Sequence, residues 1–255
     1  LTWPTIALGY VINVFERGSA SMQRINYLFD SLPEVESSLS ISKAGDGGSI
    51  QVQNLSFSYN GKPVLSAISF DIKAGETVAI VGRTGSGKST LMNLLCRLYP
   101  VEDGTIFIDG VDINLIPLQK VRRNIGYVPQ DVFLFSDTIR GNISFGKPES
   151  DSSEVERAAR ISNVLPDIEG FPDGFETFVG ERGITLSGGQ KQRIAISRAL
   201  LIDPAILILD DSLSAVDTQT EEQILSGLSS QLMDRTSILI SHRISTQRTL
   251  LMERI

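Results

Sequence analysis

The sequence predicts an α/β fold built around a mostly parallel sheet. The first observation is three continuous apolar runs, typical of strands covered on both faces: residues 77–81 (TVAIV), 205–209 (AILIL) and 237–241 (SILIS). The second observation is that a helical pattern follows each run, over residues 88–98, 211–232 and 243–253. Because strands and helices alternate along the chain, we expect parallel strands joined by helical crossovers.

The first thirty residues are predicted to form a helix. Residues 1–15 carry no charged side chain. As a helix they would span about 22 Å, less than the roughly 30 Å of a bilayer core. Residues 16–30 continue with apolar side chains at three- and four-residue steps, as on one face of a helix. Two interpretations fit this stretch: an amphipathic or core helix, or the end of a membrane-spanning helix.

A second domain is expected over residues 50–255, after a linker. Residues 31–49 are rich in serine, glycine and acidic side chains, a composition typical of linkers. The runs 49–59 and 67–72 alternate apolar and polar residues, which predicts half-buried antiparallel strands. Between about residues 137 and 201 the pattern is mainly helical, so we expect an inserted helical subdomain.

Composition excludes several classes of function. The chain has 255 residues, with 23 basic and 30 acidic side chains, one cysteine and one histidine. A single cysteine excludes an internal disulfide and a cysteine-built zinc site, and one histidine excludes a multi-histidine metal centre. The net charge of −7 argues against a protein that binds nucleic acid non-specifically.

A glycine-rich motif follows the first apolar run. Residues 82–89 (GRTGSGKS) fit the pattern G-x-x-x-x-G-K-S/T between a buried strand and a helix. Glycines let backbone N–H groups approach phosphate oxygens, and the helix directs its positive dipole end at the same anion. The motif predicts a phosphate-loop NTPase core of the RecA-like type. Its nucleotide-binding residues are Gly82, Arg83, Thr84, Gly85, Ser86, Gly87, Lys88, Ser89 and Thr90.

The same motif predicts a magnesium site. Lys88 can reach the β- and γ-phosphates, and the Ser89 hydroxyl can bind Mg²⁺. Asp210 ends the apolar run 205–209, where a second Mg²⁺ ligand is expected. An aspartate at a strand end also serves as a helix N-cap, but the phosphate loop favours the metal role. We therefore expect a nucleotide and Mg²⁺ as ligands.

Residues 186–190 (LSGGQ) lie between the phosphate loop and Asp210. They resemble the signature of ATP-binding cassette (ABC) proteins, and the whole span 50–255 resembles such a cassette. The resemblance implies ATP hydrolysis and three further site residues. Tyr59 would stack on adenine, Gln130 would contact Mg²⁺ or water as a catalytic and metal-binding residue, and His242 would donate a hydrogen bond to the γ-phosphate. Residues 179–183 and 214–217 resemble further loops of the family.

The resemblance also implies partners. In ABC proteins the signature closes over ATP that is bound to a second cassette, so the partner's ATP would be contacted by Ser187, Gly188, Gly189 and Gln190. Residues 1–30 look like the cytoplasmic end of the last transmembrane helix of an exporter, which favours the membrane interpretation of this stretch. The resemblance thus implies an ABC exporter half, with a transported small molecule, in the cell membrane with the cassette on the cytoplasmic side.

The chain departs from the family pattern at Asp211, where hydrolytic cassettes carry glutamate. The shorter side chain would place the catalytic carboxylate about 1 Å further from the attacking water, which can cost about 100-fold in rate. We therefore expect ATP to bind well and to be hydrolysed slowly, as in one subunit of bacterial heterodimeric multidrug exporters. A shifted backbone or a second water could restore hydrolysis.

Two alternative functions stay open: a regulatory cassette that holds ATP without turnover, and a soluble ABC ATPase of DNA repair or translation. The family continues beyond the switch histidine with further strands and a helix, whereas the sequence ends at Ile255. We therefore expect the cassette to be incomplete at its C-terminus.

Overall fold

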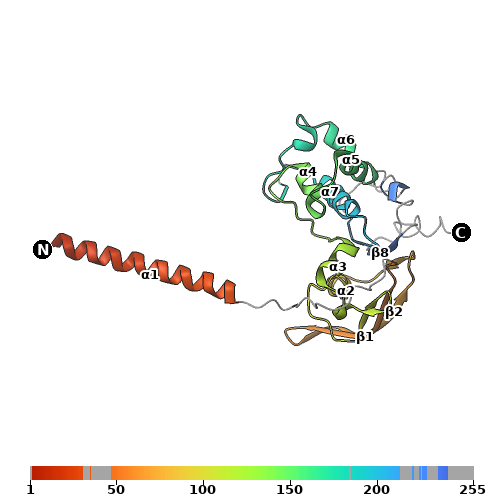
Figure 1. Ribbon diagram of the computed structural model, residues 1–255, viewed down its shortest axis with the longest axis horizontal. Helices are drawn as coiled ribbons and strands as arrows, with labels where there is room; N and C mark the ends of the chain where they lie inside the picture. Colours follow the sequence, from red (N-terminus) through yellow and green to blue (C-terminus); the bar gives the residue numbers. More distant parts are fainter. Residues whose placement is uncertain are drawn as a thin grey trace. The chain divides into compact units, whose positions relative to one another are not determined.

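The computed structural model describes residues 2–30, 35, 47–183, 185–212, 220, 224, 226–228 and 235–240 (Figure 1). The chain separates into two compact units, Leu1–Glu36 and Ser37–Ile255. The expected linker, residues 31–49, lies largely outside the described residues.

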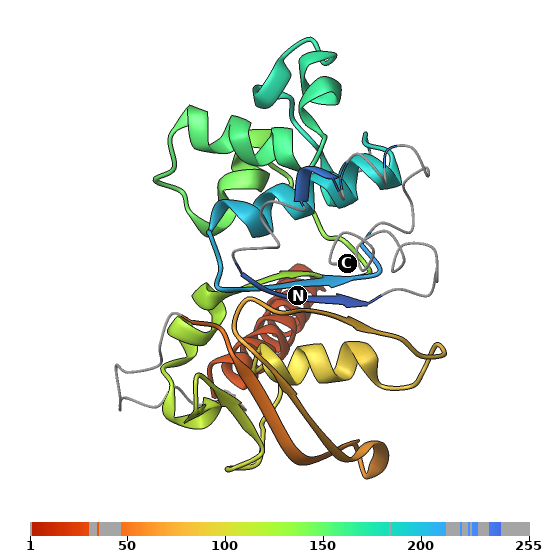
Figure 2. The same cartoon turned by 90° about the vertical axis from the view of Figure 1, so that its right-hand side faces the viewer.

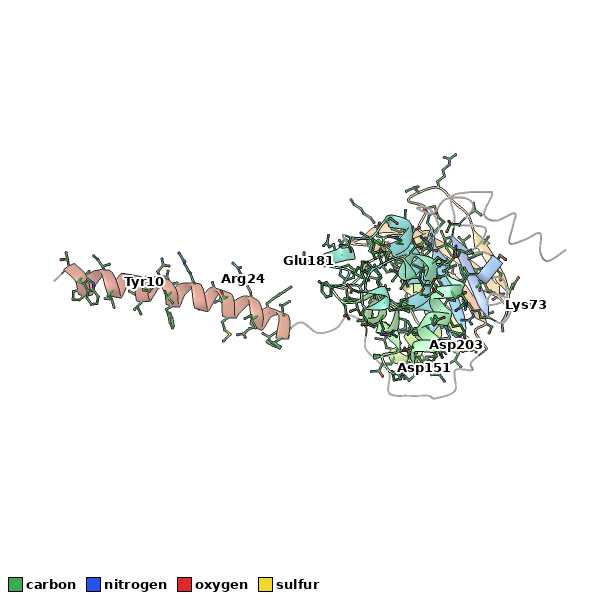
Figure 3. The ribbon with its side chains drawn as sticks, turned by 90° about the horizontal axis from the view of Figure 1, so that it is seen from above. Tyr10, Arg24, Lys73, Asp151, Glu181 and Asp203 are labelled. Atoms are coloured by element: carbon green, nitrogen blue, oxygen red, sulfur yellow. The ribbon has the colours of Figure 1, made fainter. Side chains whose placement is uncertain are left out.

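The first unit contains one long helix, α1 (Thr2–Asp30). Its 29 residues include none that is buried, and Trp3 and Phe29 are 79% and 83% exposed. Side chains such as Tyr10 and Arg24 project outward from it (Figure 3). This confirms the predicted helix. In the described part of the chain, no helix combines the length and the apolar character that crossing a membrane requires.

An antiparallel sheet with the strand order β2-β1-β4-β5 opens the second unit. The strands β1 (Ile50–Tyr59) and β2 (Lys62–Ile72) are joined at Asn60-Gly61, and β4 (Ile106–Ile108) and β5 (Val111–Asp112) are joined at Asp109-Gly110. All four turn residues have positive φ, as a two-residue hairpin turn of type I′ requires. The strands expected at 49–59 and 67–72 are confirmed, the second beginning five residues earlier than the alternating pattern indicated.

A parallel sheet with the strand order β3-β8-β7-β6 forms the centre of the second unit. Its strands are β3 (Thr77–Ile80), β6 (Ile125–Val128), β7 (Ile206–Asp210) and β8 (Thr236–Ile240). The three predicted apolar runs are thereby confirmed as parallel strands, and β6 is a fourth that the sequence reasoning missed.

Helices cover both faces of this sheet (Figure 2). The helix α2 (Lys88–Leu95) packs between the two sheets, in a core shared with Ile206 and Ile208 of β7. On the opposite face α7 (Gly188–Leu201) packs against Leu207 and Leu209. Successive residues of β7 therefore enter two different cores, which explains why its first four residues are all apolar.

The expected helix over residues 88–98 ends earlier, at Leu95. Arg97 has a φ of 47°, in the left-handed region that a right-handed helix cannot contain. The helices expected over residues 211–232 and 243–253 lie largely outside the described residues.

A group of helices surrounds its own apolar core (Figure 1). This core includes Ile139, Val155, Ile168 and Ile194. Helices are thus present where the sequence predicted an inserted subdomain: α4 (Ile139–Ile143), α5 (Ser152–Ile161), α6 (Leu165–Glu169) and α7. The remaining short elements are α3 (Leu118–Asn124) and the 3₁₀ turns η1 (Ile113–Leu115), η2 (Ser144–Gly146), η3 (Gly174–Glu176) and η4 (Glu181–Gly183).

Candidate nucleotide-binding site

The phosphate loop, Asp210 and Gln130 each follow or end a strand of the parallel sheet, at the same edge. The phosphate loop follows β3, Asp210 is the last residue of β7, and Gln130 comes two residues after β6. Parallel strands place their carboxyl ends at the same edge, where ligands bind in sheets of this kind. Because only β8 separates β3 from β7, the two strand ends lie about 10 Å apart.

The phosphate loop closes around the side chain of Lys88. Its ammonium group donates hydrogen bonds to the carbonyl oxygens of Gly82, at 2.7 Å, and of Arg83, at 3.0 Å, and contacts Ser86 Oγ at 3.4 Å. The backbone N–H of Ser86 donates to the Arg83 carbonyl at 3.1 Å. The positive charge therefore lies inside the loop, where it can meet a phosphate.

The glycines of the loop are required by geometry. Gly85 and Gly87 have φ values of 81° and 90°, which other residues adopt only with strain. A Cβ on Gly87 would stand 2.6 Å from Leu65 Cδ2, and one on Gly82 would stand 2.8 Å from Ser86 Oγ. The backbone can therefore approach an anion closely, so the residues present fit a phosphate group.

The helix α2 begins directly at this loop. Its N-cap is Gly87, which supplies no capping side chain. The first N–H groups of a helix lack partners within the helix and carry its positive dipole end. The helix start at Lys88, with Ser89 and Thr90 in the first turn, is thus suited to binding phosphate.

Asp210 is a buried carboxylate, 2% exposed. The hydroxyl of Tyr127, on the neighbouring strand β6, contacts its Oδ2 at 3.4 Å. Burial, together with the charge of Asp210, raises the pKa of Tyr127, so its hydroxyl stays protonated and able to donate. Tyr127 was not predicted; its only sequence signal is its position in the strand that precedes Gln130.

The candidate Mg²⁺ ligands are the hydroxyl of Ser89, the carboxylate of Asp210 and the amide of Gln130. Among the residues that the structure describes, no three His, Cys, Asp or Glu side chains form a metal-binding group. A set with one carboxylate fits Mg²⁺ held jointly by protein and nucleotide phosphates, because this ion keeps few protein ligands. Gln130 is exposed at its strand end.

Asp211 follows directly on Asp210 at the sheet edge. Its backbone N–H donates to the Ile240 carbonyl of β8 at 2.8 Å, and its φ is 47°. Aspartate tolerates this left-handed conformation better than most residues. The half-buried side chain thus starts from a backbone that is held in place by β8.

Tyr59 ends β1 and is half-buried. Its ring contacts those of Phe57 and Tyr99 in edge-on geometry. Two further predicted features lie outside the described residues: His242, and the loop at residues 214–217.

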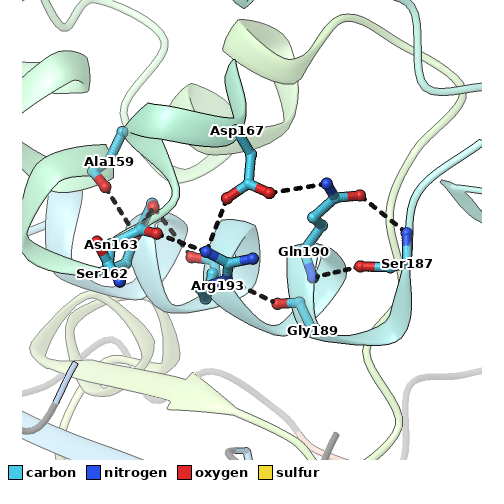
Figure 4. Close-up of polar contacts among 9 residues, drawn as sticks. Ala159, Ser162, Asn163, Asp167, Ser187, Gly189, Gln190 and Arg193 are labelled. Atoms are coloured by element: carbon cyan, nitrogen blue, oxygen red, sulfur yellow. Dashed lines mark hydrogen bonds and ion pairs between the residues drawn. The ribbon is translucent and has the colours of Figure 1, made fainter. Parts of the chain in front are cut away.

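The signature residues form the start of α7 (Figure 4). Ser187 Oγ accepts a hydrogen bond from the Gln190 N–H at 3.2 Å, and Gln190 Oε1 accepts one from the Ser187 N–H at 2.9 Å. This reciprocal capping box is a strong helix start. Ser187 and Gly188 are exposed, so this helix N-terminus is accessible to an anion on another molecule.

Two residues that the sequence reasoning missed hold the signature in place (Figure 4). Asp167 accepts from Gln190 Nε2 at 2.9 Å and pairs with Arg193 at 2.7 Å. Arg193 also donates to the Asn163 carbonyl at 2.6 Å. The side chain of Gln190 is therefore engaged in orienting the helix start. No local pattern links Asp167 to the signature, because the contact joins two helices.

The fold and the site define a nucleotide-binding domain of the phosphate-loop class. The family model described as ABC transporter matches residues 65–214. The chain therefore belongs to the ABC transporter family and carries its ATPase domain.

Named relatives agree with this assignment. The probable multidrug resistance ABC transporter ATP-binding/permease protein YheI of Bacillus subtilis is 43% identical over 247 residues, which make up 96% of this chain and 42% of that protein. An ATP-dependent lipid A-core flippase of Vibrio vulnificus is 44% identical over 247 residues, covering 95% of this chain and 42% of the flippase. The chain thus spans less than half the length of these curated relatives.

A solved structure of a bacterial Atm1-family ABC exporter with ATP bound is also similar. It has a TM-score of 0.81 and 40% sequence identity, and the match covers 94% of this chain and 42% of the exporter. The predicted fold class is therefore confirmed.

Proposed function

We propose that the chain is the motor domain of an ABC exporter. Three features support the proposal: the phosphate loop and Asp210 at one sheet edge, an exposed signature helix, and relatives named as permeases and flippases. In this function ATP binding draws two cassettes together and hydrolysis separates them, which drives efflux of a small molecule. The helix α1 then continues a membrane domain, with the cassette on the cytoplasmic side.

Each site residue takes one role in this proposal. Lys88 and the loop N–H groups bind the β- and γ-phosphates, and Tyr59 stacks on adenine. Ser89, Gln130 and Asp210 hold Mg²⁺, which neutralises charge on the phosphates.

The signature and the switch histidine complete the pocket. The signature residues contact ATP on a second cassette. His242 contacts the γ-phosphate of this chain's own ATP.

The site of this chain is proposed to hydrolyse ATP slowly. Asp211 carries this proposal, because it stands where a catalytic carboxylate is needed but is one methylene shorter than glutamate. The signature LSGGQ is intact and can serve a partner's site. A heterodimer with a glutamate-bearing half-transporter therefore fits best, with one hydrolytic and one mainly ATP-holding site.

Steady-state ATPase measurements test the slow site. Asp211→Glu should raise kcat by about 100-fold, while the affinity for ADP stays the same. Asp211→Asn, which keeps the size but removes the base, should abolish the residual activity. Full activity of the unmodified chain alone would contradict the proposal. Activity that appears only on mixing with a glutamate-bearing half-transporter would support the heterodimer.

Export is tested on the protein that carries this domain, in inside-out membrane vesicles. ATP-dependent uptake of a fluorescent drug or lipid is expected, and Lys88→Met should abolish it. Equal uptake by the Lys88→Met protein would show that the domain does not drive transport.

A further inference from the structure

Three aromatic rings meet at the end of β1. The ring of Tyr59 lies 4.9 Å from that of Phe57 and 5.2 Å from that of Tyr99, measured between centroids. The interplanar angles are 88° and 78°, so both contacts are edge-to-face. Phe57 and Tyr99 are themselves 5.7 Å apart at 54°. Each ring therefore contacts the other two.

The two neighbours of Tyr59 are anchored in the protein interior. Phe57 precedes Tyr59 by two residues on the same strand, so both side chains project from one face. Phe57 and Tyr99 pack half-buried against the core between the two sheets, which includes Leu94 and Leu95 of α2. The position of the Tyr59 ring is thus set by two rings that belong to this core.

Tyr99 is placed by the same helix that presents the phosphate loop. α2 begins at Lys88 and ends at Leu95, and the chain then turns at Arg97, whose φ is 47°. The Leu98 N–H donates to the Asn93 carbonyl at 2.9 Å, which closes this turn. One short helix therefore connects the phosphate loop to a ring that contacts Tyr59.

The remaining geometry suits a planar ligand. Neither neighbouring ring lies parallel to Tyr59, and no other described ring contacts it. A purine stacks on an aromatic side chain in an offset parallel arrangement, which demands a fixed ring orientation.

We infer that Phe57 and Tyr99 are positioning residues that hold Tyr59 in the orientation for stacking on the nucleotide base. The inference rests on the proposed function, in which Tyr59 contacts adenine. Losing one of these aromatic contacts should leave the Tyr59 ring less well oriented and raise the Kd for a nucleotide that carries a base about two- to tenfold.

Calorimetric titration of the 255-residue chain with ADP and with pyrophosphate tests the inference. Pyrophosphate keeps the phosphate contacts but has no base, and neither ligand is hydrolysed as ATP is. Tyr99→Leu and Phe57→Leu should each weaken ADP binding about two- to tenfold and leave pyrophosphate binding unchanged. Tyr99→Phe keeps the ring and should restore ADP affinity. Phe175→Leu, a half-buried ring in the helical region, is the matched control and should change neither.

A double-mutant cycle separates positioning from general destabilisation. In a Tyr59→Ala background, Tyr99→Leu should have no further effect on the affinity for ADP, because the residue it positions is gone. Equal weakening of ADP and pyrophosphate by Tyr99→Leu would overturn the inference. So would unchanged ADP affinity in both leucine variants while Tyr59→Ala weakens binding. Unchanged ADP affinity in Tyr59→Ala itself would instead overturn the proposed role of Tyr59.

Discussion

Replacing Gly87 by alanine should disrupt the phosphate loop more than the same change at Gly85. Both glycines have a positive φ, 90° and 81° respectively. An alanine at either position therefore acquires backbone strain of about 1–2 kcal/mol. The two positions differ in the space around them: a Cβ on Gly85 meets nothing within 4 Å, whereas a Cβ on Gly87 meets β2. The pair of variants thus separates strain from steric overlap.

The overlap at Gly87 can be estimated from the structure. The added Cβ would lie 2.6 Å from Leu65 Cδ2 and 3.2 Å from the Val64 carbonyl oxygen, against a normal carbon–carbon contact of about 3.5–4.0 Å. The Leu65 methyl can move, but the carbonyl belongs to a paired strand. Overpacking of this kind costs about 1–3 kcal/mol. Gly87→Ala should therefore lower the free energy of unfolding by about 2–5 kcal/mol in total.

Urea denaturation of the unmodified chain and the two variants measures the difference. Gly61→Ala, at a hairpin turn with φ 77° and open space, is a control for strain outside the loop. We expect Gly85→Ala and Gly61→Ala to lose similar stability and Gly87→Ala to lose about 1–3 kcal/mol more. If Gly87→Ala unfolds at the same urea concentration as Gly85→Ala, the close approach of β2 does not constrain the loop, and the reasoning is wrong.

Three further predictions concern polar groups at buried or half-buried positions. Asn142 is fully buried, and its side-chain Oδ1 accepts hydrogen bonds from Arg198 and from the Phe135 N–H, at 2.8 Å each. Asn142→Leu removes this acceptor and should cost about 3 kcal/mol or more in urea denaturation; a loss under about 1 kcal/mol would contradict this. Burial raises the pKa of Cys96 from 9.0 to about 12. The thiol of Cys96 in the folded chain should therefore resist iodoacetamide at pH 8, as measured by mass spectrometry, and alkylation at the rate of the unfolded chain would refute its burial. The free energy of unfolding should also fall above about pH 9, because the thiol of the unfolded chain loses its proton at a lower pH than the buried one. Tyr127→Phe removes the hydroxyl beside Asp210 and should raise the Mg²⁺ concentration for half-maximal ADP binding about two- to fivefold, whereas an unchanged Mg²⁺ dependence excludes a positioning role.

The predicted strands and the missed one differ in how local their signals are. β7 is apolar at every position but its last because both faces are buried, so its sequence identifies it. β6 was missed because its run is short and contains Gly126. That glycine is explained only by packing: a Cβ there would stand 2.7 Å from Pro204 Cγ and 2.8 Å from the Ala199 carbonyl.

The residues of the site also differ in how local their sequence signals are. The phosphate loop was predictable because a contiguous motif of eight residues encodes it, and Asp210 because it ends an apolar run. The contact between Tyr127 and Asp210 joins residues 83 positions apart, and Asp167 reaches Gln190 across 23 positions. Contacts of this kind depend on how strands and helices pack, so no local sequence pattern predicts them.

The sequence by itself determined the chemistry of each segment: a loop that binds phosphate, carboxylates after a buried strand, and a capped helix start at Ser187. The tertiary structure decided which of these segments meet. Thr77 of β3 pairs with Ser237, and Asp210 pairs with Ile240, so β8 lies between the phosphate loop strand and the carboxylate strand. This order follows from long-range strand pairing and from burial on both faces of the sheet, which are properties of the folded chain as a whole.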